Sequence, residues 1–111
     1  MEPFFSHVNA QWQDVGGGLS RSILGHTPQL MAVAVRFTKG AVGTPHAHDV
    51  HHQISYVAEG SFEAIVGGER KVLIKGDAFT APDHTLHGAT SLEEGSVLID
   101  MFSPRRDDFL A

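Results

Sequence analysis

Apolar residues in this chain occur in short runs that alternate with polar residues and are separated by glycine and proline. In the first run, every second residue from Met31 to Phe37 is large and apolar, which places these side chains on one face of a strand. No window keeps a helical period, so the pattern predicts an all-β fold. The apolar runs span residues 30–37, 53–57, 62–66, 72–74 and 97–102.

Turn signals between these runs indicate how the strands connect. Gly67-Gly68 separates residues 62–66 from 69–74, and a two-glycine linker is typical of a tight β-hairpin. Gly76-Asp77 marks the next turn. Strands at roughly ten-residue intervals favour a closed or sandwiched antiparallel barrel. With 111 residues, the chain fits a single domain over residues 1–111.

The first 29 residues have a weaker pattern than the barrel core predicted over residues 30–111. Their apolar side chains show no clear period and are interrupted by Gly16-Gly17-Gly18, so we expect edge strands here. Two interpretations stay open: the segment covers a sheet edge or a partner subunit, or it packs as a strand on its own barrel. The apolar residues concerned are Phe4, Phe5, Val8, Trp12, Leu19, Ile23 and Leu24.

Charge and composition narrow the range of partners. The net charge is −5 and the eight lysines and arginines are scattered, which argues against a nucleic-acid-binding surface. No stretch approaches eighteen consecutive apolar residues, which excludes a transmembrane helix. There is no cysteine, and the first ten residues lack the basic start and apolar run of a signal peptide, so a cytoplasmic location is the default expectation.

Four residues have the chemistry of metal ligands. His46 and His48 stand two positions apart, which on a strand directs both imidazoles to the same side. Gln53 follows after enough chain to reach the next strand, and His87 offers a fourth donor. Neutral nitrogens and an amide oxygen aimed at one point suit a divalent metal ion that keeps coordination positions open for a substrate.

Three further histidines near this set stay open. His51 or His52 could take the place of Gln53 as a ligand, because a bend before them would change which side chains face inward. His84 precedes His87 by three residues and fits either a pocket wall or a group that supports the ligands.

A carboxylate interrupts the last apolar run. A buried Asp100 is costly unless it is partnered or needed for chemistry, and alternation places it on the same face as Phe102. If this face lines the barrel, a general acid or base and an aromatic wall flank the metal. The alternative is a structural ion pair with an arginine. Arg105 and Arg106 follow this run, and either fits a solvated strand end.

Two segments resemble the two motifs of the cupin family. The first has the spacing G-x5-H-x-H-x4-Q-x6-G from Gly40 to Gly60, and the second has G-x5-P-x4-H from Gly76 to His87. The resemblance implies a jelly-roll-like antiparallel β-barrel, and a homodimer because cupins are often dimers. The chain departs from the motifs at three positions, with Gln53 for the usual Glu, His84 for a Gly and Ser91 for an Asn.

The order Asp-x-Phe-x-Pro-x-Arg from Asp100 to Arg106, together with the glutamine, resembles a narrower group. These are small cupins from pectin degradation, the uronate-linearising or KdgF-type proteins. The resemblance implies that Asp100 and Arg106 are catalytic and that Phe102 and Arg106 bind substrate. It also implies a ligand set of His46, His48, Gln53 and His87.

This resemblance implies the opening and ketonisation of 4,5-unsaturated uronates, the small anionic sugars that pectin and alginate lyases release. Three imidazoles and an amide oxygen admit one Ni, Zn, Fe, Mn or Co ion. Two alternatives remain. A metal-dependent cupin dioxygenase is disfavoured by Gln53, because a neutral ligand set does little for ferric iron. A non-catalytic module that binds or senses sugar acids is disfavoured by Asp100, which would repel an anionic ligand.

Overall fold

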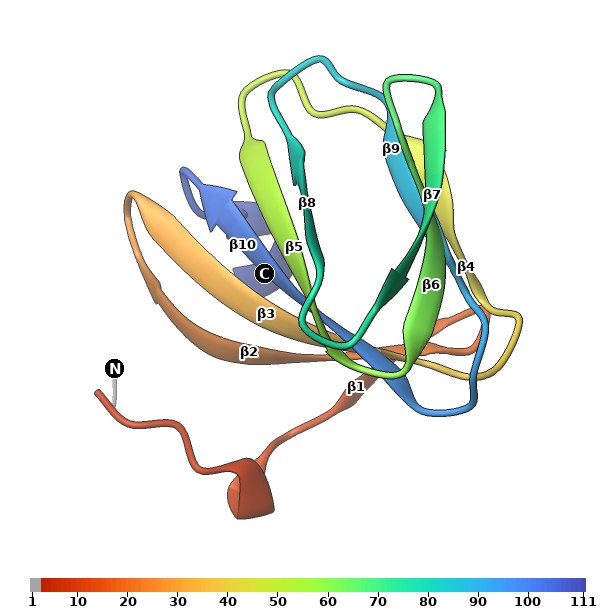
Figure 1. Cartoon of the computed structure of the whole chain (residues 1–111). Coiled ribbons are helices and arrows are strands. Elements are labelled where there is room, and N and C mark those ends of the chain that lie inside the picture. The colour runs from red at the N-terminus through yellow and green to blue at the C-terminus, as the bar shows by residue number, and fades with distance from the viewer. Residues whose placement is uncertain (1–2) are drawn as a thin grey trace.

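Two antiparallel β-sheets face each other in the computed structural model of this protein, which describes residues 3–111 (Figure 1). The larger sheet has the order β1 (Gln13–Gly16), β2 (Leu19–Thr27), β3 (Leu30–Phe37), β10 (Ser96–Ser103), β5 (His52–Glu59) and β8 (Ala78–Ala81). The smaller sheet has the order β4 (Val42–His46), β9 (His87–Ser91), β6 (Ser61–Val66) and β7 (Glu69–Ile74). Two short 3-10 helices, η1 (His7–Asn9) and η2 (Asp107–Leu110), flank the strands. Within residues 3–111, no helix has the length and apolar character needed to span a membrane.

The predicted all-β antiparallel barrel is confirmed, and the five apolar runs lie in β3, β5, β6, β7 and β10. The predicted hairpin is also present. Gly67 and Gly68 connect β6 to β7 with φ angles of 56° and 89°, which residues with a Cβ atom rarely adopt. Val66 and Glu69 are direct register partners on either side of this turn.

Strands β4, β8 and β9 have no counterpart among the apolar runs. They are short and are built largely from glycine, alanine, threonine and proline, so alternation carries little signal in them. Strands β4 and β9 nevertheless approach each other closely. A Cβ at Gly88 would lie 2.8 Å from the carbonyl oxygen of Gly43, so this position requires glycine. The close pairing makes His46 and His87 register partners.

The core between the sheets fixes the strands that carry the candidate site. Phe37 and Phe62 meet edge to face with ring centroids 4.9 Å apart, and the larger apolar cluster is built around them. A second cluster joins Met31 and Val33 to Phe102, whose side chain is buried. Close packing of Phe102 holds β10, and therefore the residues next to it on the same face, in a defined position.

The N-terminal part adds two strands to the larger sheet. Residues 13–27 form β1 and β2, which extend the sheet beyond β3, and residues 3–12 lead away from the barrel (Figure 1). Phe4 and Val8 in this leading segment are 83% and 89% exposed. Residues 1 and 2, which belong to the predicted single domain, lie outside the described residues. That this segment covers a partner subunit stays a prediction.

Candidate metal centre and active site

Three histidine rings come together where β4, the loop after it and β9 meet. The candidate ligand atoms of His46, His48 and His87 all lie within 4.8 Å of one another. The His46 ring centroid is 4.5 Å from that of His87 and 4.7 Å from that of His48. His87 is buried whereas His46 is exposed, so the group is anchored on one side and open on the other. This arrangement suits a metal site that also binds a ligand.

The position of His48 differs from the strand expectation. Strand β4 ends at His46, so His48 lies in the following loop and not two positions along a pleat. Its carbonyl oxygen accepts a hydrogen bond from the backbone N–H of His84 at 2.7 Å. His84 has a φ of 65°, which lets the backbone turn at this point. A loop-to-loop contact therefore positions His48.

A chain of hydrogen bonds connects the histidines to the carboxylate of β10. The Gln53 amide N–H donates to Ser55 Oγ at 2.9 Å, and the Ser55 hydroxyl donates to Asp100 Oδ1 at 2.6 Å. Ser55 and Asp100 are register partners on β5 and β10. Because its nitrogen is committed to Ser55, Gln53 turns Oε1 toward the imidazoles. The distances from Oε1 to Nε2 are 3.1 Å for His48 and 3.0 Å for His87.

The hydrogen-bonding pattern of these rings fits a cation. Nδ1 of His46 donates to Thr44 O at 2.8 Å, and Nδ1 of His87 donates to Thr85 O at 2.9 Å. A neutral ring with its proton on Nδ1 carries a lone pair on Nε2. Burial lowers the pKa of His87, so this ring is neutral at neutral pH. Its Nε2 and Gln53 Oε1 are then two acceptors facing each other, which is favourable when a metal ion lies between them.

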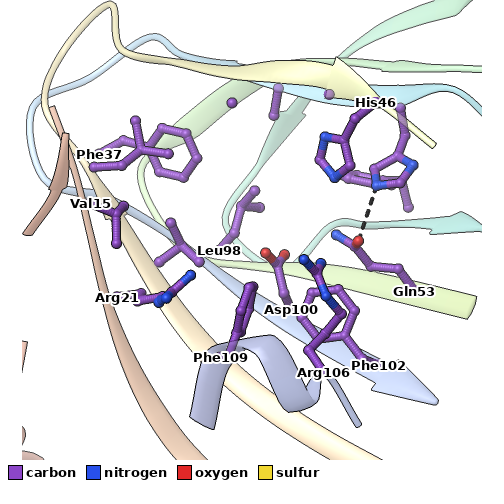
Figure 2. A pocket seen from close by; sticks show the side chains of 17 residues that line it. Val15, Arg21, Phe37, His46, Gln53, Leu98, Asp100, Phe102, Arg106 and Phe109 are labelled. Carbon is purple, nitrogen blue, oxygen red and sulfur yellow. Dashed lines mark hydrogen bonds between the residues drawn. The ribbon is translucent and has the colours of Figure 1, made fainter. Parts of the chain in front are cut away.

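A cavity of about 170 Å³ adjoins the histidine group (Figure 2). Asp100 and Phe102 line it from one face of β10, as alternation predicts. Arg106, from the loop after β10, also lines the cavity, and its guanidinium carbon lies 5.3 Å from the Phe102 ring centroid. The structure therefore brings these three predicted residues together with His46 and Gln53 around a single cavity.

Asp100 does not form the ion pair with an arginine that the sequence also allowed. In residues 3–111, the ion pairs within 4.0 Å involve other carboxylates, and the short contact of Asp100 is the hydrogen bond from Ser55. Burial raises the pKa of Asp100 to about 6, against the opposing effect of the Ser55 hydrogen bond. A carboxylate with this pKa can exchange protons near neutral pH, as a general acid or base requires.

Comparison with known protein families supplies the classification. The model of the cupin domain matches residues 33–101, which is more than half of the chain. The chain belongs to the cupin family.

Similar proteins define more narrowly where this chain belongs within the cupin family. It is 52% identical to the pectin degradation protein KdgF of Dickeya dadantii, with 99% of this chain and 100% of that protein aligned. The structure of KdgF from Halomonas sp. matches with a TM-score of 0.95 at 55% identity, covering 98% and 99% of the two chains. An RmlC-like cupin from Shewanella frigidimarina matches with a TM-score of 0.93 at 49% identity, covering 98% and 96%. The resemblance to KdgF-type proteins is confirmed.

The other histidines of this cupin make different contacts. His51 Nε2 lies 3.2 Å from the carbonyl oxygen of Arg105. His52 is exposed and its Nδ1 lies 3.8 Å from the Asp83 carboxylate. Among residues 3–111, neither belongs to the group of three converging donors. The geometry therefore favours Gln53 over both as the fourth ligand.

Several residues of the site were not found from the sequence. Ser55, which is fully buried, connects Gln53 to Asp100, and its position two residues after Gln53 on one face of β5 is a signal that could have found it. Arg21 and Phe109 also line the cavity. Phe109 lies in η2, beyond the last apolar run, where no periodic pattern marks it.

The raised pKa of Asp100 predicts a stability effect. Ionisation of Asp100 opposes folding as pH rises from its usual pKa of 3.8 to about 6, and the full cost is present above that range. Asp100→Asn should therefore raise the free energy of unfolding of the metal-free protein by about 2 to 3 kcal/mol at neutral pH. Denaturant titration measures the difference. Below the usual Asp pKa the two proteins should be about equally stable, and a wild type that is more stable at neutral pH would contradict the assignment.

Proposed function

We propose that this cupin opens and ketonises 4,5-unsaturated uronates produced by pectin or alginate lyases, yielding linear keto acids. The observation that carries the proposal is the placement of a carboxylate, Asp100, and a guanidinium, Arg106, in one cavity with the histidine group. An anionic sugar needs both a cationic anchor and a group that moves protons. The similarity to KdgF proteins of pectin degradation supports the same reaction.

The substrate is a cyclic hemiacetal with a double bond between C4 and C5, beside the ring oxygen. Removal of the proton from the anomeric hydroxyl lets the bond between C1 and the ring oxygen break. C1 becomes an aldehyde, and the ring oxygen remains on C5 as an enol or enolate. Protonation at C4 then gives the ketone at C5. The reaction is an isomerisation, so the proton taken from one position can be returned at another.

His46, His48, His87 and Gln53 would hold one divalent transition metal ion, because their lone pairs converge and all four donors are neutral. Nickel, zinc, iron, manganese and cobalt all suit nitrogen and amide oxygen ligands. Such an ion supplies positive charge that stabilises negative charge on substrate oxygen atoms.

Asp100 is the group that moves the proton. It lines the cavity, and burial raises its pKa to about 6, so at neutral pH it is largely ionised and can accept the anomeric proton. The same carboxyl group can then deliver a proton to C4. Ser55 donates a hydrogen bond to Oδ1, which orients the carboxylate and leaves Oδ2 for the substrate.

Arg106 binds the substrate carboxylate. Its Nε and Nη2 donate to the two carboxylate oxygens of Asp108 at 3.0 and 2.8 Å, which fixes the plane of the guanidinium. The end formed by Nη1 and the second Nη2 proton remains available for a bidentate contact. Phe102 and Phe109 pack against the guanidinium at 5.3 and 4.3 Å, and Phe102 also supplies an apolar wall that excludes water.

Arg106→Ala is expected to raise KM for the unsaturated uronate roughly 10- to 100-fold, because a charge-assisted contact to the carboxylate is lost. Arg106→Lys should restore binding only in part, since an ammonium cannot form the bidentate pair. Steady-state kinetics measure both variants. The matched control is Arg105→Ala, because Arg105 pairs with Asp107 and does not line the cavity. Full activity of Arg106→Lys would contradict the bidentate contact.

The proposed reaction is tested by following the ultraviolet absorbance of an unsaturated uronate, which disappears as the C4–C5 double bond is lost. Spontaneous ring opening gives the background rate, and the enzyme must exceed it. The two alternative functions, dioxygenase and non-catalytic binding module, predict different results in this assay. A dioxygenase consumes molecular oxygen, and a binding module leaves the background rate unchanged.

We also propose that the protein is a homodimer, while its cytoplasmic location stays a prediction from the sequence. Ile54 and Tyr56 on the outer face of the larger sheet are 45% and 42% exposed, and Phe4 and Val8 of the leading segment are more exposed still. Burial of such side chains against a second copy would remove apolar surface from water. Sedimentation at micromolar concentration should give twice the monomer mass of 12.0 kDa. A strictly monomeric species would contradict the dimer.

A further inference from the structure

Arg21 is a second arginine in the candidate active-site cavity. It lies on β2 and pairs in register with Gln13 on β1 and Val35 on β3. Leu19, two positions earlier on the same face of the strand, lines the cavity with it. Most of the neighbouring cavity wall is apolar and includes Val35, so a guanidinium here is exceptional.

The side chain of Arg21 is half-buried, and its guanidinium has no polar partner among residues 3–111. Its Nε is buried and has no hydrogen-bond partner among residues 3–111. No carboxylate oxygen in this part of the chain lies within 4.0 Å of Arg21. The guanidinium makes a cation–π contact with the Phe109 ring, whose centroid is 4.0 Å from the guanidinium carbon. A buried donor without an acceptor is costly, and an acceptor supplied by a ligand removes that cost.

Arg106 offers an internal comparison. Its guanidinium carbon lies 4.3 Å from the same Phe109 centroid, but Asp108 binds it through two hydrogen bonds. Figure 2 shows Phe109 edge-on between the two arginines, with Arg21 on the side away from His46. The cavity thus has a guanidinium bound by Asp108 on one side of Phe109 and, within residues 3–111, a guanidinium without a protein partner on the other side.

We propose that Arg21 is a substrate-binding residue that donates hydrogen bonds to the hydroxyl groups of the uronate ring. The inference rests on the proposed function, in which Arg106 holds the carboxylate attached to C5. In a six-membered sugar ring, C2 lies opposite C5. A sugar held at C5 near Arg106 therefore presents its C2 hydroxyl, with the neighbouring C3 hydroxyl, toward Arg21. Pectin- and alginate-derived unsaturated uronates differ in configuration at C2, so Arg21 contacts the position that distinguishes them.

The test uses the metal-loaded protein and the variant Arg21→Met, which keeps an unbranched apolar stem and removes the guanidinium. Two non-reacting probes are titrated by calorimetry. Galacturonate carries the carboxylate and the ring hydroxyls, whereas tetrahydropyran-2-carboxylate carries the carboxylate alone. The galacturonate dissociation constant should rise roughly 10- to 100-fold in the variant, and that of the hydroxyl-free probe should not change. For the unsaturated uronate, KM should rise by a similar factor with kcat nearly unchanged.

Arg36→Met is the matched control. Arg36 lies on the adjacent strand β3, is exposed and stacks over Trp12 at 4.1 Å, outside the cavity. This substitution should leave both dissociation constants and KM unchanged. Thermal melting of each variant checks that it is folded.

Two results would overturn the role of Arg21: equal loss of affinity for both probes, or no loss for galacturonate. Failure of the proposed function is seen separately. A wild-type protein that binds galacturonate but does not accelerate linearisation would contradict the proposed function. The two dissociation constants would still show whether Arg21 contacts the hydroxyl groups.

Discussion

Replacement of Asp100 by asparagine is expected to lower kcat roughly 100- to 10,000-fold, the usual effect of removing a general acid or base. Asparagine preserves the size of the side chain and can still accept the hydrogen bond from Ser55, which is 2.6 Å long in the wild type. It cannot take or deliver a proton. The variant should therefore keep its bound metal and its affinity for substrate while losing turnover, which steady-state kinetics and elemental analysis measure together.

The control for this substitution is Asp77→Asn. Asp77 lies in the exposed turn between β7 and β8, where its carboxylate accepts a hydrogen bond from the Ile74 N–H at 3.0 Å. An asparagine oxygen can accept the same bond, so activity should be unchanged. Near-normal turnover of Asp100→Asn with intact metal would remove Asp100 from the reaction.

Replacement of His46 by alanine is expected to reduce bound metal from about one ion per chain to a small fraction, because a ligand of a compact site is lost. Linearisation should fall to the spontaneous background. His46 is the most suitable of the three histidines for this test because it is exposed, so its removal leaves the core intact. Elemental analysis of the purified protein gives the metal-to-protein ratio.

His52→Ala is the matched control for the metal experiment. His52 is also exposed and its ring is within 3.8 Å of Asp83, outside the group of converging donors. Metal content should equal that of the wild type. An unchanged metal-to-protein ratio in His46→Ala would exclude His46 as a ligand. A lowered metal-to-protein ratio in His52→Ala would indicate that His52 is a ligand.

Alternation was sufficient to predict the strand that carries the catalytic candidates. In β10, Leu98, Asp100 and Phe102 share the face that lines the cavity, because a regular strand directs every second side chain to one side. Alternation also located β3, and the two-glycine turn located the β6–β7 hairpin. These predictions succeed because the strands are long, regular and apolar on the buried face.

Loops limited what the sequence could predict about the site. His48 reaches the cluster through a loop held by the backbone of His84, and no side-chain period describes such a contact. The residues also could not distinguish Arg106, which lines the cavity, from Arg105, which pairs with Asp107. No sequence pattern marks Arg21, because the missing acceptor for its Nε is a property of the folded chain.

The proposed ligand set of His46, His48, His87 and Gln53 is neutral. A glutamate at position 53 would cancel part of the charge of a divalent ion, whereas Gln53 would leave that charge to act on an anionic substrate. The hydrogen-bond chain through Ser55 holds the Gln53 oxygen toward the histidines and also orients Asp100. One chain of contacts thus aligns the candidate metal ligand with the candidate proton-transfer group.

The central claim is that a metal ion held by neutral donors accelerates the opening of an unsaturated uronate. The most direct measurement compares the rate of loss of ultraviolet absorbance for the purified protein, the same protein after chelation, and the chelated protein reloaded with nickel, zinc, iron, manganese or cobalt. We expect acceleration above the spontaneous rate, its loss on chelation and its return with at least one of these ions. Acceleration that persists in protein shown by elemental analysis to be free of metal would contradict the claim.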